Sequence, residues 1–322
     1  MITKLSIKNF KSIKELDIDC ARVNLFIGEP NTGKSNILEA LGLLSWFGFL
    51  NDNIGEYVRL QYMYHLFYDY GIEEDIRIAV DSENDEKVEI KFDGDYFTAY
   101  SDGKYAVTLD KFGNNIKPPD KPAKSQIKIY KFINQYKYLG NELSFLMPPH
   151  GSNMLLLISG HKKLRETVSP FFRELGFKIM IREYDNTWES TKEINESIFG
   201  YPSILVSDTL QRMIFYNVAI DSNENSVLVF EEPEVHAFPS YIKQLGEKIA
   251  FDESNQYFIV THNPYLFLSI VEKAPKDDVN VFITYMEDYQ TKVKQANDKE
   301  ISKLMRYDPF FNLTHMVGKE TQ

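Results

Sequence analysis

The most constraining feature of the chain is the segment Gly28-Glu29-Pro30-Asn31-Thr32-Gly33-Lys34-Ser35, which fits the pattern G-x-x-x-x-G-K-[ST] at every fixed position. The apolar run 23–27 before it predicts a buried strand, and the leucine-rich run from Lys34 to about Phe47 predicts a helix. A strand, a glycine turn and a helix in this order surround an anion with backbone N–H groups and the positive end of the helix dipole. The segment therefore predicts a phosphate-binding loop in an α/β fold.

Each residue type in this loop has a chemical reason. The glycines let the backbone turn tightly, and Lys34 brings a positive charge to the outer phosphates of a nucleotide. The hydroxyl of Ser35 is a suitable ligand for Mg²⁺. The loop thus predicts a Mg²⁺-bound nucleoside triphosphate, with the choice between ATP and GTP left open by these residues alone. The expected nucleotide-binding set comprises Gly28, Glu29, Pro30, Asn31, Thr32, Gly33, Lys34, Ser35 and Asn36.

A second apolar run, Ser226–Phe230, ends in the adjacent carboxylates Glu231 and Glu232. In a parallel sheet the carboxyl ends of the strands face the ligand crevice. We therefore expect Glu231 to hold Mg²⁺, directly or through water, and Glu232 to polarise the attacking water as a general base. A strand that simply ends in solvated acids is the plainer interpretation of this segment alone, and the loop at 28–35 favours the metal site.

A third apolar run, Tyr257–Val260, is followed by Thr261-His262-Asn263-Pro264. A histidine at the carboxyl end of a strand can sense or stabilise the terminal phosphate of a nucleotide. A lone histidine in this position is more often a structural donor. The presence of the other two motifs in the same chain favours the catalytic role for His262.

Together these segments resemble the ABC-type ATPase heads of the RecF/SMC/OLD group, and the AAA-like ATPases of the OLD family in particular. The resemblance rests on Ile7-Lys8-Asn9-Phe10-Lys11-Ser12, on the phosphate loop, on Glu231-Glu232-Pro233-Glu234-Val235-His236 and on 261–264. It covers about 1–45 and 203–270. It implies an ATP-binding and ATP-hydrolysing P-loop NTPase of ABC type, with an α/β fold, a mixed sheet, an antiparallel N-terminal meander and an inserted α/β or helical lobe.

The resemblance also implies a division of the chain. Residues 1–112 would form the first part of the ATPase head, with the phosphate loop and a β-meander at 74–109. Residues 113–202 would form an inserted middle lobe. Residues 203–322 would complete the head with the signature segment, the strand ending at Glu231 (Walker B) and the switch histidine.

The signature segment Ser207-Asp208-Thr209 departs from the group, which has a glycine shortly after the serine. The resemblance implies that Ser207 contacts a phosphate in trans, across a two-fold head-to-head dimer that encloses two ATP molecules. The alternative is that Ser207 merely caps a helix. The glutamine that the group places near the metal has three candidates: Gln61, Gln126 and Gln135.

Charge limits the range of partners. The chain has 36 basic and 47 acidic residues and a formal net charge of -11, which excludes a surface that coats nucleic acid all over. A lysine-rich stretch with aromatic neighbours leaves local DNA binding open, although a solvated face is the preferred interpretation. Its basic residues are Lys117, Lys121, Lys124, Lys128 and Lys131.

No apolar run predicts a membrane span or a signal peptide, and the single cysteine, Cys20, fits a reducing compartment, so the sequence predicts a soluble, cytoplasmic protein. The leading hypothesis is a nucleotide-gated dimer switch that works with an effector protein in DNA maintenance or in defence against mobile elements. One alternative is a nucleotide-gated scaffold with negligible hydrolysis. An OLD-type nuclease is disfavoured because 60 residues after His262 are too few for a TOPRIM domain, and a long-armed SMC role is disfavoured because the sequence has no heptads.

Overall fold

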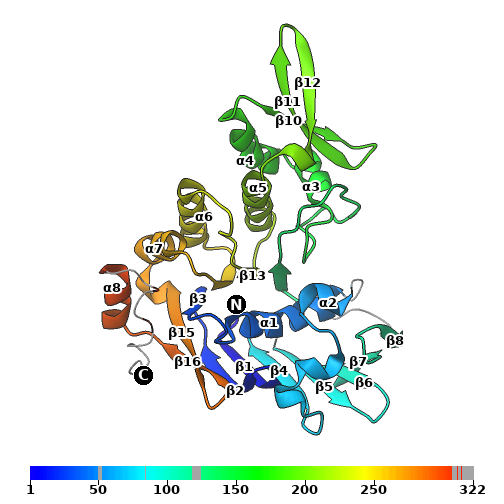
Figure 1. Ribbon diagram of the computed structural model, residues 1–322, viewed down its shortest axis with the longest axis vertical. Coiled ribbons are helices and arrows are strands. Elements are labelled where there is room, and N and C mark those ends of the chain that lie inside the picture. The colour runs from blue at the N-terminus through cyan, green and yellow to red at the C-terminus, as the bar shows by residue number, and fades with distance from the viewer. Residues whose placement is uncertain (50–52, 84, 118–124, 307–309, 311–312, 314–322) are drawn as a thin grey trace.

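The computed structural model describes residues 1–49, 53–83, 85–117, 125–306, 310 and 313. The fold is mixed α/β. A six-stranded sheet and a seven-stranded sheet enclose one helix, and a third, three-stranded sheet stands away from both at the far end of the molecule (Figure 1).

The six-stranded sheet carries the three apolar runs. Its strand order is β16-β15-β3-β14-β13-β9, and all neighbours pair in parallel except β15 and β16. Every residue of β3, β9 and β14 is buried, as in a parallel sheet covered on both faces. The strands are β3 (Val23–Gly28), β9 (Ile127–Tyr130), β13 (Val227–Glu231), β14 (Gln256–Val260), β15 (Val279–Glu287) and β16 (Gln290–Gln295). The parallel pairing brings the carboxyl ends of β3, β14 and β13 to one edge.

The seven-stranded sheet is antiparallel, and its order β2-β1-β4-β5-β6-β7-β8 confirms the expected meander. Buried and more exposed residues alternate along one of its strands, as the pleat requires. Ile76, Ile78 and Val80 are buried, and the residues between them are more exposed. The strands are β1 (Lys4–Phe10), β2 (Ile13–Asp19), β4 (Ile76–Asp81), β5 (Glu86–Phe92), β6 (Phe97–Ser101), β7 (Lys104–Leu109) and β8 (Asn115–Lys117).

The helix α1 (Lys34–Phe49) follows the phosphate loop and lies between these two sheets (Figure 1). It is apolar nearly all round, which suits a helix covered on every side. The other face of the parallel sheet is covered by α5 (Asp208–Asp221), α6 (Pro239–Phe251) and α7 (Pro264–Lys273), whose apolar residues share one core with Leu228 and Phe230 of β13. The described residues 53–70 include the short α2 (Ile54–Tyr57) and two 3₁₀ turns, Met63–Leu66 and Tyr68–Tyr70.

The range 113–202, expected as a middle lobe, contributes elements to more than one sheet. Within 113–202, β9 pairs with β13 and so belongs to the central parallel sheet. In the same range β8 belongs to the seven-stranded sheet. The later described residues include α3 (Met154–Gly160), α4 (Lys162–Arg173) and the outlying sheet of β10 (Lys178–Arg182), β11 (Thr187–Ile194) and β12 (Ser197–Pro202). The helix α8 (Asp298–Arg306) follows β16.

Two lysines of the lysine-rich stretch do not lie on a solvated face. Lys128 is buried and donates to Oδ1 of Asn223 at 2.5 Å, and Lys131 donates to the carbonyl of Tyr57 at 2.7 Å. Lys117 is exposed in β8, and Lys121 and Lys124 lie outside the described residues. Within the part of the chain that the structure describes, none of the helices has the length and apolarity that crossing a membrane requires.

Candidate functional site

The phosphate loop packs so closely against the β15–β16 hairpin that only glycine fits at its two ends. Gly33 has φ +86°, and a β-carbon there would lie 1.9 Å from Oγ1 of Thr291. A β-carbon on Gly28 would lie 2.2 Å from Oγ1 of Thr284. The two threonines come from β16 and β15, more than 250 residues along the chain, and nothing in their local sequence marks them as part of the site.

The side chain of Lys34 is folded over the loop. Its Nζ atom donates to the carbonyl oxygens of Gly28 at 2.9 Å and Glu29 at 2.7 Å, and Thr32 also donates to Glu29 at 2.8 Å. Lys34 is 5% exposed. Burial lowers the pKa of Lys34 to about 8, although the negative charges of Glu232 and Glu29 oppose this effect. The lysine charge is therefore held at the loop and is available to an anion bound there.

The remaining loop residues prepare the start of α1. Ser35 is the second residue of the helix, and Asn36 closes the turn by donating its N–H to the carbonyl of Gly33 at 3.0 Å. The side-chain amide of Asn36 donates to Oγ of Ser12 at 2.6 Å. Pro30 and Asn31 are exposed at the tip of the loop, and Asn31 has φ +61°. The loop is thus braced by hydrogen bonds to the start of α1 and to Ser12.

The acids and the histidine meet at the same sheet edge. Glu231 is paired in register with Val260, and the N–H of Glu232 donates to the carbonyl of Val260 at 2.9 Å. Nε2 of His262 lies 3.5 Å from Oε1 of Glu232. Burial and the charge of Lys34 lower the pKa of His262, and the charge of Glu232 opposes them. His262 is therefore neutral at pH 7, so that its ring can act as a hydrogen-bonding group beside the acid.

A buried ion-pair cluster stands beside Glu231, and like Thr284 and Thr291 it was not expected from the motifs. Glu39 of α1 is fully buried between Lys11 and Arg59; its Oε1 lies 2.6 Å from Nε of Arg59, and its Oε2 pairs with Nζ of Lys11. Nη2 of Arg59 lies 3.8 Å from Oε1 of Glu231. Burial raises the pKa of Glu39, but Lys11 and Arg59 outweigh it and hold the pKa below its usual value. The cluster places two cations next to the expected metal ligand.

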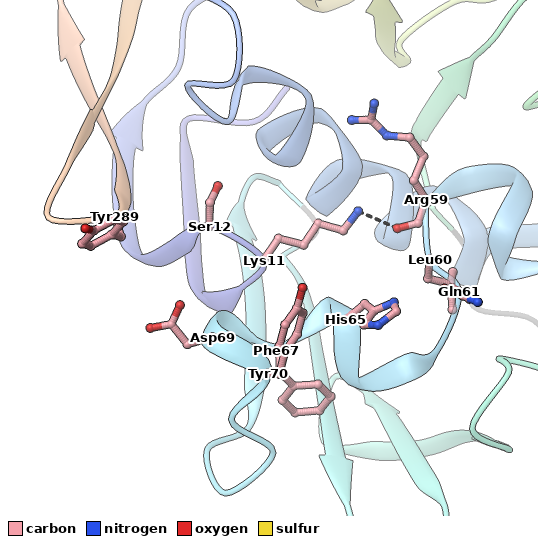
Figure 2. A pocket seen from close by; sticks show the side chains of 10 residues that line it. All are labelled: Lys11, Ser12, Arg59, Leu60, Gln61, His65, Phe67, Asp69, Tyr70 and Tyr289. Atoms are coloured by element: carbon pink, nitrogen blue, oxygen red, sulfur yellow. Dashed lines mark hydrogen bonds between the residues drawn. The ribbon is translucent and has the colours of Figure 1, made fainter.

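A cavity of about 640 Å³ opens on the other side of Lys11. Ser12 connects it with the loop, because Oγ of Ser12 contacts both Asn36 and Thr291 at 2.6 Å. Figure 2 shows the charged ends of Lys11 and Arg59 on one side and the rings of His65, Phe67 and Tyr70 grouped on another. The cavity thus runs from a cationic, loop-side end to an aromatic end. It is lined by Lys11, Ser12, Arg59, Leu60, Gln61, His65, Phe67, Asp69, Tyr70 and Tyr289.

The three candidate glutamines lie in different places. Gln126 precedes β9 at the amino end of the parallel sheet, opposite the edge that holds Glu231. Gln135 follows the carboxyl end of β9, where its amide donates to the carbonyl of His150. Gln61 lines the cavity.

Ser207 is the N-cap of α5. Its Oγ accepts the N–H of Leu210 at 3.3 Å, so this serine caps the helix.

Comparison with known proteins agrees with this architecture. The family described as an AAA ATPase domain matches residues 1–145, which hold the phosphate loop, α1 and the antiparallel sheet. The solved structure of the SMC head bound to the C-winged helix domain of ScpA is similar with a TM-score of 0.57 and 15% identity, over 93% of this chain and 99% of that chain. The chain has the fold of an SMC head domain.

A second solved structure gives the same result. The SMC head domain with an extended coiled coil, bound to the C-terminal domain of ScpA and derived from Pyrococcus furiosus, has a TM-score of 0.54 and 12% identity, over 95% of this chain and 98% of that chain. At these identities the likeness concerns the fold, and it confirms the expected α/β, P-loop NTPase fold of ABC type. No curated protein has a sequence that matches the chain.

Proposed function

We propose that the chain is an ATPase that binds ATP with Mg²⁺, hydrolyses it and works as a nucleotide-gated, head-to-head dimer. The observation that carries this proposal is the meeting of Lys34, Glu232 and His262 at one edge of the parallel sheet, close enough for their charges to act on one another. The loop and its helix come from the first part of the chain, and the acid and the histidine come from the last third.

Each of the three groups has a role that follows from its position. Lys34 would bind the outer phosphates as a point charge released from the carbonyls of Gly28 and Glu29. Glu232 would accept the proton of the attacking water as a general base. His262, which burial keeps neutral, would donate its single ring N–H to the terminal phosphate, with Glu232 beside the ring.

The residues suited to hold Mg²⁺ are Ser35 and Glu231. A hydroxyl at the start of a helix and a partly exposed carboxylate are the oxygen ligands that this ion prefers, and the bound ion would neutralise phosphate charge. Arg59 faces the same carboxylate at 3.8 Å. Its side chain is 63% exposed, and with Nε paired to Glu39 its Nη groups are the ones that would meet a phosphate.

The nucleoside would occupy the cavity beside Ser12. A cationic end near the loop suits the ribose and phosphates, and the rings of His65 and Tyr70 offer surfaces on which a base can stack. The exposed amide of Gln61 and the carboxylate of Asp69 are available to the edge of the base. We propose ATP as the nucleotide bound in this cavity, and GTP is the competitor to be tested.

The dimer is proposed from the position of Ser207. It begins α5, on the face of the parallel sheet opposite α1, so a phosphate contact from this helix would be made to the nucleotide of a second copy. The SMC heads of similar fold are bound to domains of ScpA. By analogy we propose that this chain also acts on an effector protein, in DNA maintenance or in defence against mobile elements.

The test measures ATP binding, phosphate release and molecular mass on one preparation, with and without Mg²⁺. The Glu232→Gln protein should bind ATP, remain dimeric and lose turnover by at least a hundredfold. Glu253→Gln, an exposed acid just before β14, is the matched control and should behave as the wild type. Unchanged turnover in Glu232→Gln would refute the assigned base. Tight ATP-dependent dimerisation with negligible turnover in the wild type would favour the scaffold alternative.

A further inference from the structure

The turn that follows β13 carries two acids that hold different parts of the same histidine. Oε1 of Glu232 lies 3.5 Å from the ring Nε2 of His262. Two residues further on, Glu234 is 5% exposed, and its Oε1 accepts both the backbone N–H of His262 at 3.1 Å and the hydroxyl of Thr261 at 2.6 Å. One acid of this short turn therefore lies beside the ring of His262, and another holds its backbone.

The hydrogen bonds of Glu234 continue into α7. Oγ1 of Thr261 accepts the N–H of Asn263 at 3.0 Å, and Oδ1 of Asn263 caps the helix by accepting the N–H groups of Tyr265 at 2.8 Å and Leu266 at 3.3 Å. Thr261 is fully buried. One connected set of bonds thus holds the whole turn between β14 and α7.

The place of Glu234 explains why such bonds are needed. The paired register of β13 and β14 ends with Glu231 opposite Val260. Beyond that pair the segments that follow β13 and β14 enter separate turns. In the turn after β13, Glu232 adopts φ +44° and His236 φ +60°. Past the end of the backbone ladder, the side chain of Glu234 connects the two segments by hydrogen bonds to Thr261 and His262.

We propose, on the basis of the proposed ATPase function, that Glu234 is a positioning residue for hydrolysis: it sets the imidazole of His262 against Glu232 and the terminal phosphate. Its carboxylate reaches the histidine only through the backbone and Thr261, so its effect is on geometry. Small displacements of a reacting group lower a rate strongly, whereas they change ground-state binding little.

A role restricted to folding would not favour a carboxylate here. Among the described residues, Oε2 of Glu234 has no hydrogen-bond partner, and burial raises the pKa of the group to about 7. A buried acid with an unpaired oxygen is costly, because it loses hydration that the fold does not replace. Strained or costly groups of this kind are typical of functional sites.

The test compares Glu234→Ala, Glu234→Gln, Thr261→Val and Thr261→Ser with the wild type and with Glu253→Ala. We expect Glu234→Ala and Thr261→Val to lower kcat about 10- to 100-fold while Kd for Mg²⁺-ATP changes by less than about threefold. Glu234→Gln and Thr261→Ser keep an acceptor or a donor in place and should recover most of the lost rate. Melting curves establish which variants are folded, and if Glu234→Ala is not, the threonine pair carries the same test.

A double-mutant cycle separates positioning from a general structural role. In a His262→Ala background, Glu234→Ala should produce almost no further loss of kcat, because the group it positions is gone. Fully additive losses, or equal losses of kcat and ATP affinity, would overturn the inference. A wild-type protein that neither binds nor hydrolyses ATP would instead overturn the proposed function, so the two failures are distinguishable.

Discussion

Oε1 of Glu39 lies 2.6 Å from Nε of Arg59, and the glutamate that makes this contact is fully buried. The same carboxylate pairs with Lys11 through its other oxygen and also accepts the backbone N–H of Arg59 at 3.1 Å. One residue of α1 therefore fixes the β1–β2 turn and the start of the cavity wall against the helix of the phosphate loop. We therefore expect a change at Glu39 to affect both the stability of the fold and the proposed nucleotide binding.

The first prediction concerns Glu39→Gln. The change leaves the cations of Lys11, whose side chain is 12% exposed, and Arg59 without their carboxylate, and breaking a buried ion pair in this way costs about 3 kcal/mol. The free energy of unfolding, measured with urea, should fall by that order. Glu15→Gln is the matched control, because its ion pair with Lys8 is more than half exposed and should contribute less than about 1 kcal/mol. Equal effects of both changes would contradict the prediction.

The second prediction concerns Gly33→Ala. The new β-carbon would lie 1.9 Å from Oγ1 of Thr291, so the loop and the β15–β16 hairpin would have to separate. We expect a loss of stability of roughly 2–4 kcal/mol and at least a tenfold weaker binding of ATP. Gly103→Ala is the control, because Gly103 has a similar φ of +72° but open space around it. Alanine at Gly103 should cost only the backbone strain, about 1 kcal/mol.

Much of the site follows from local patterns in the sequence. The phosphate loop, the paired acids and His262 each end an apolar run, and the structure confirms that these runs lie in neighbouring parallel strands. A fully apolar strand can be recognised because both faces of a parallel sheet are buried. What the residues would do at the sheet edge remains a prediction of their chemistry.

The rest of the site depends on contacts between distant residues. Thr291 touches Ser12 across 279 residues, and Thr284 touches Thr32 across 252 residues. Arg59 lies in an irregular segment without periodicity. Similarly, β9 has only four residues after a proline-rich stretch, and its place in the central sheet is fixed by its pairing with β13. Such contacts leave no local pattern, and the burial of Lys128 and the hydrogen bond of Lys131 to Tyr57 likewise could not be inferred from composition.

The third prediction concerns pH and nucleotide affinity. Burial lowers the pKa of Lys34 to about 8, so the ammonium charge is present below that pH and is lost above it. Since an anion favours the charged form, Kd for ATP should rise roughly tenfold between pH 7 and pH 9. In Lys34→Arg the guanidinium does not titrate in this range, so the rise should be absent, and in Lys34→Met binding should be weak at both values. Parallel pH curves for wild type and Lys34→Arg would show that another group controls binding.

The last prediction concerns Glu234→Gln and the pH dependence of stability. Burial raises the pKa of Glu234 to about 7, so the folded protein binds this proton more tightly than the unfolded chain does. Stability therefore falls as pH rises from the unfolded pKa toward 7, because the buried group must ionise at increasing cost. Between pH 6 and pH 8 the wild type should lose about 1 kcal/mol that Glu234→Gln keeps, measured by urea unfolding at both values. Glu253→Gln, an exposed acid, should follow the wild type. If wild type and Glu234→Gln changed equally with pH, Glu234 would be ionised in the fold throughout this range, at a pKa far below the one that its burial imposes.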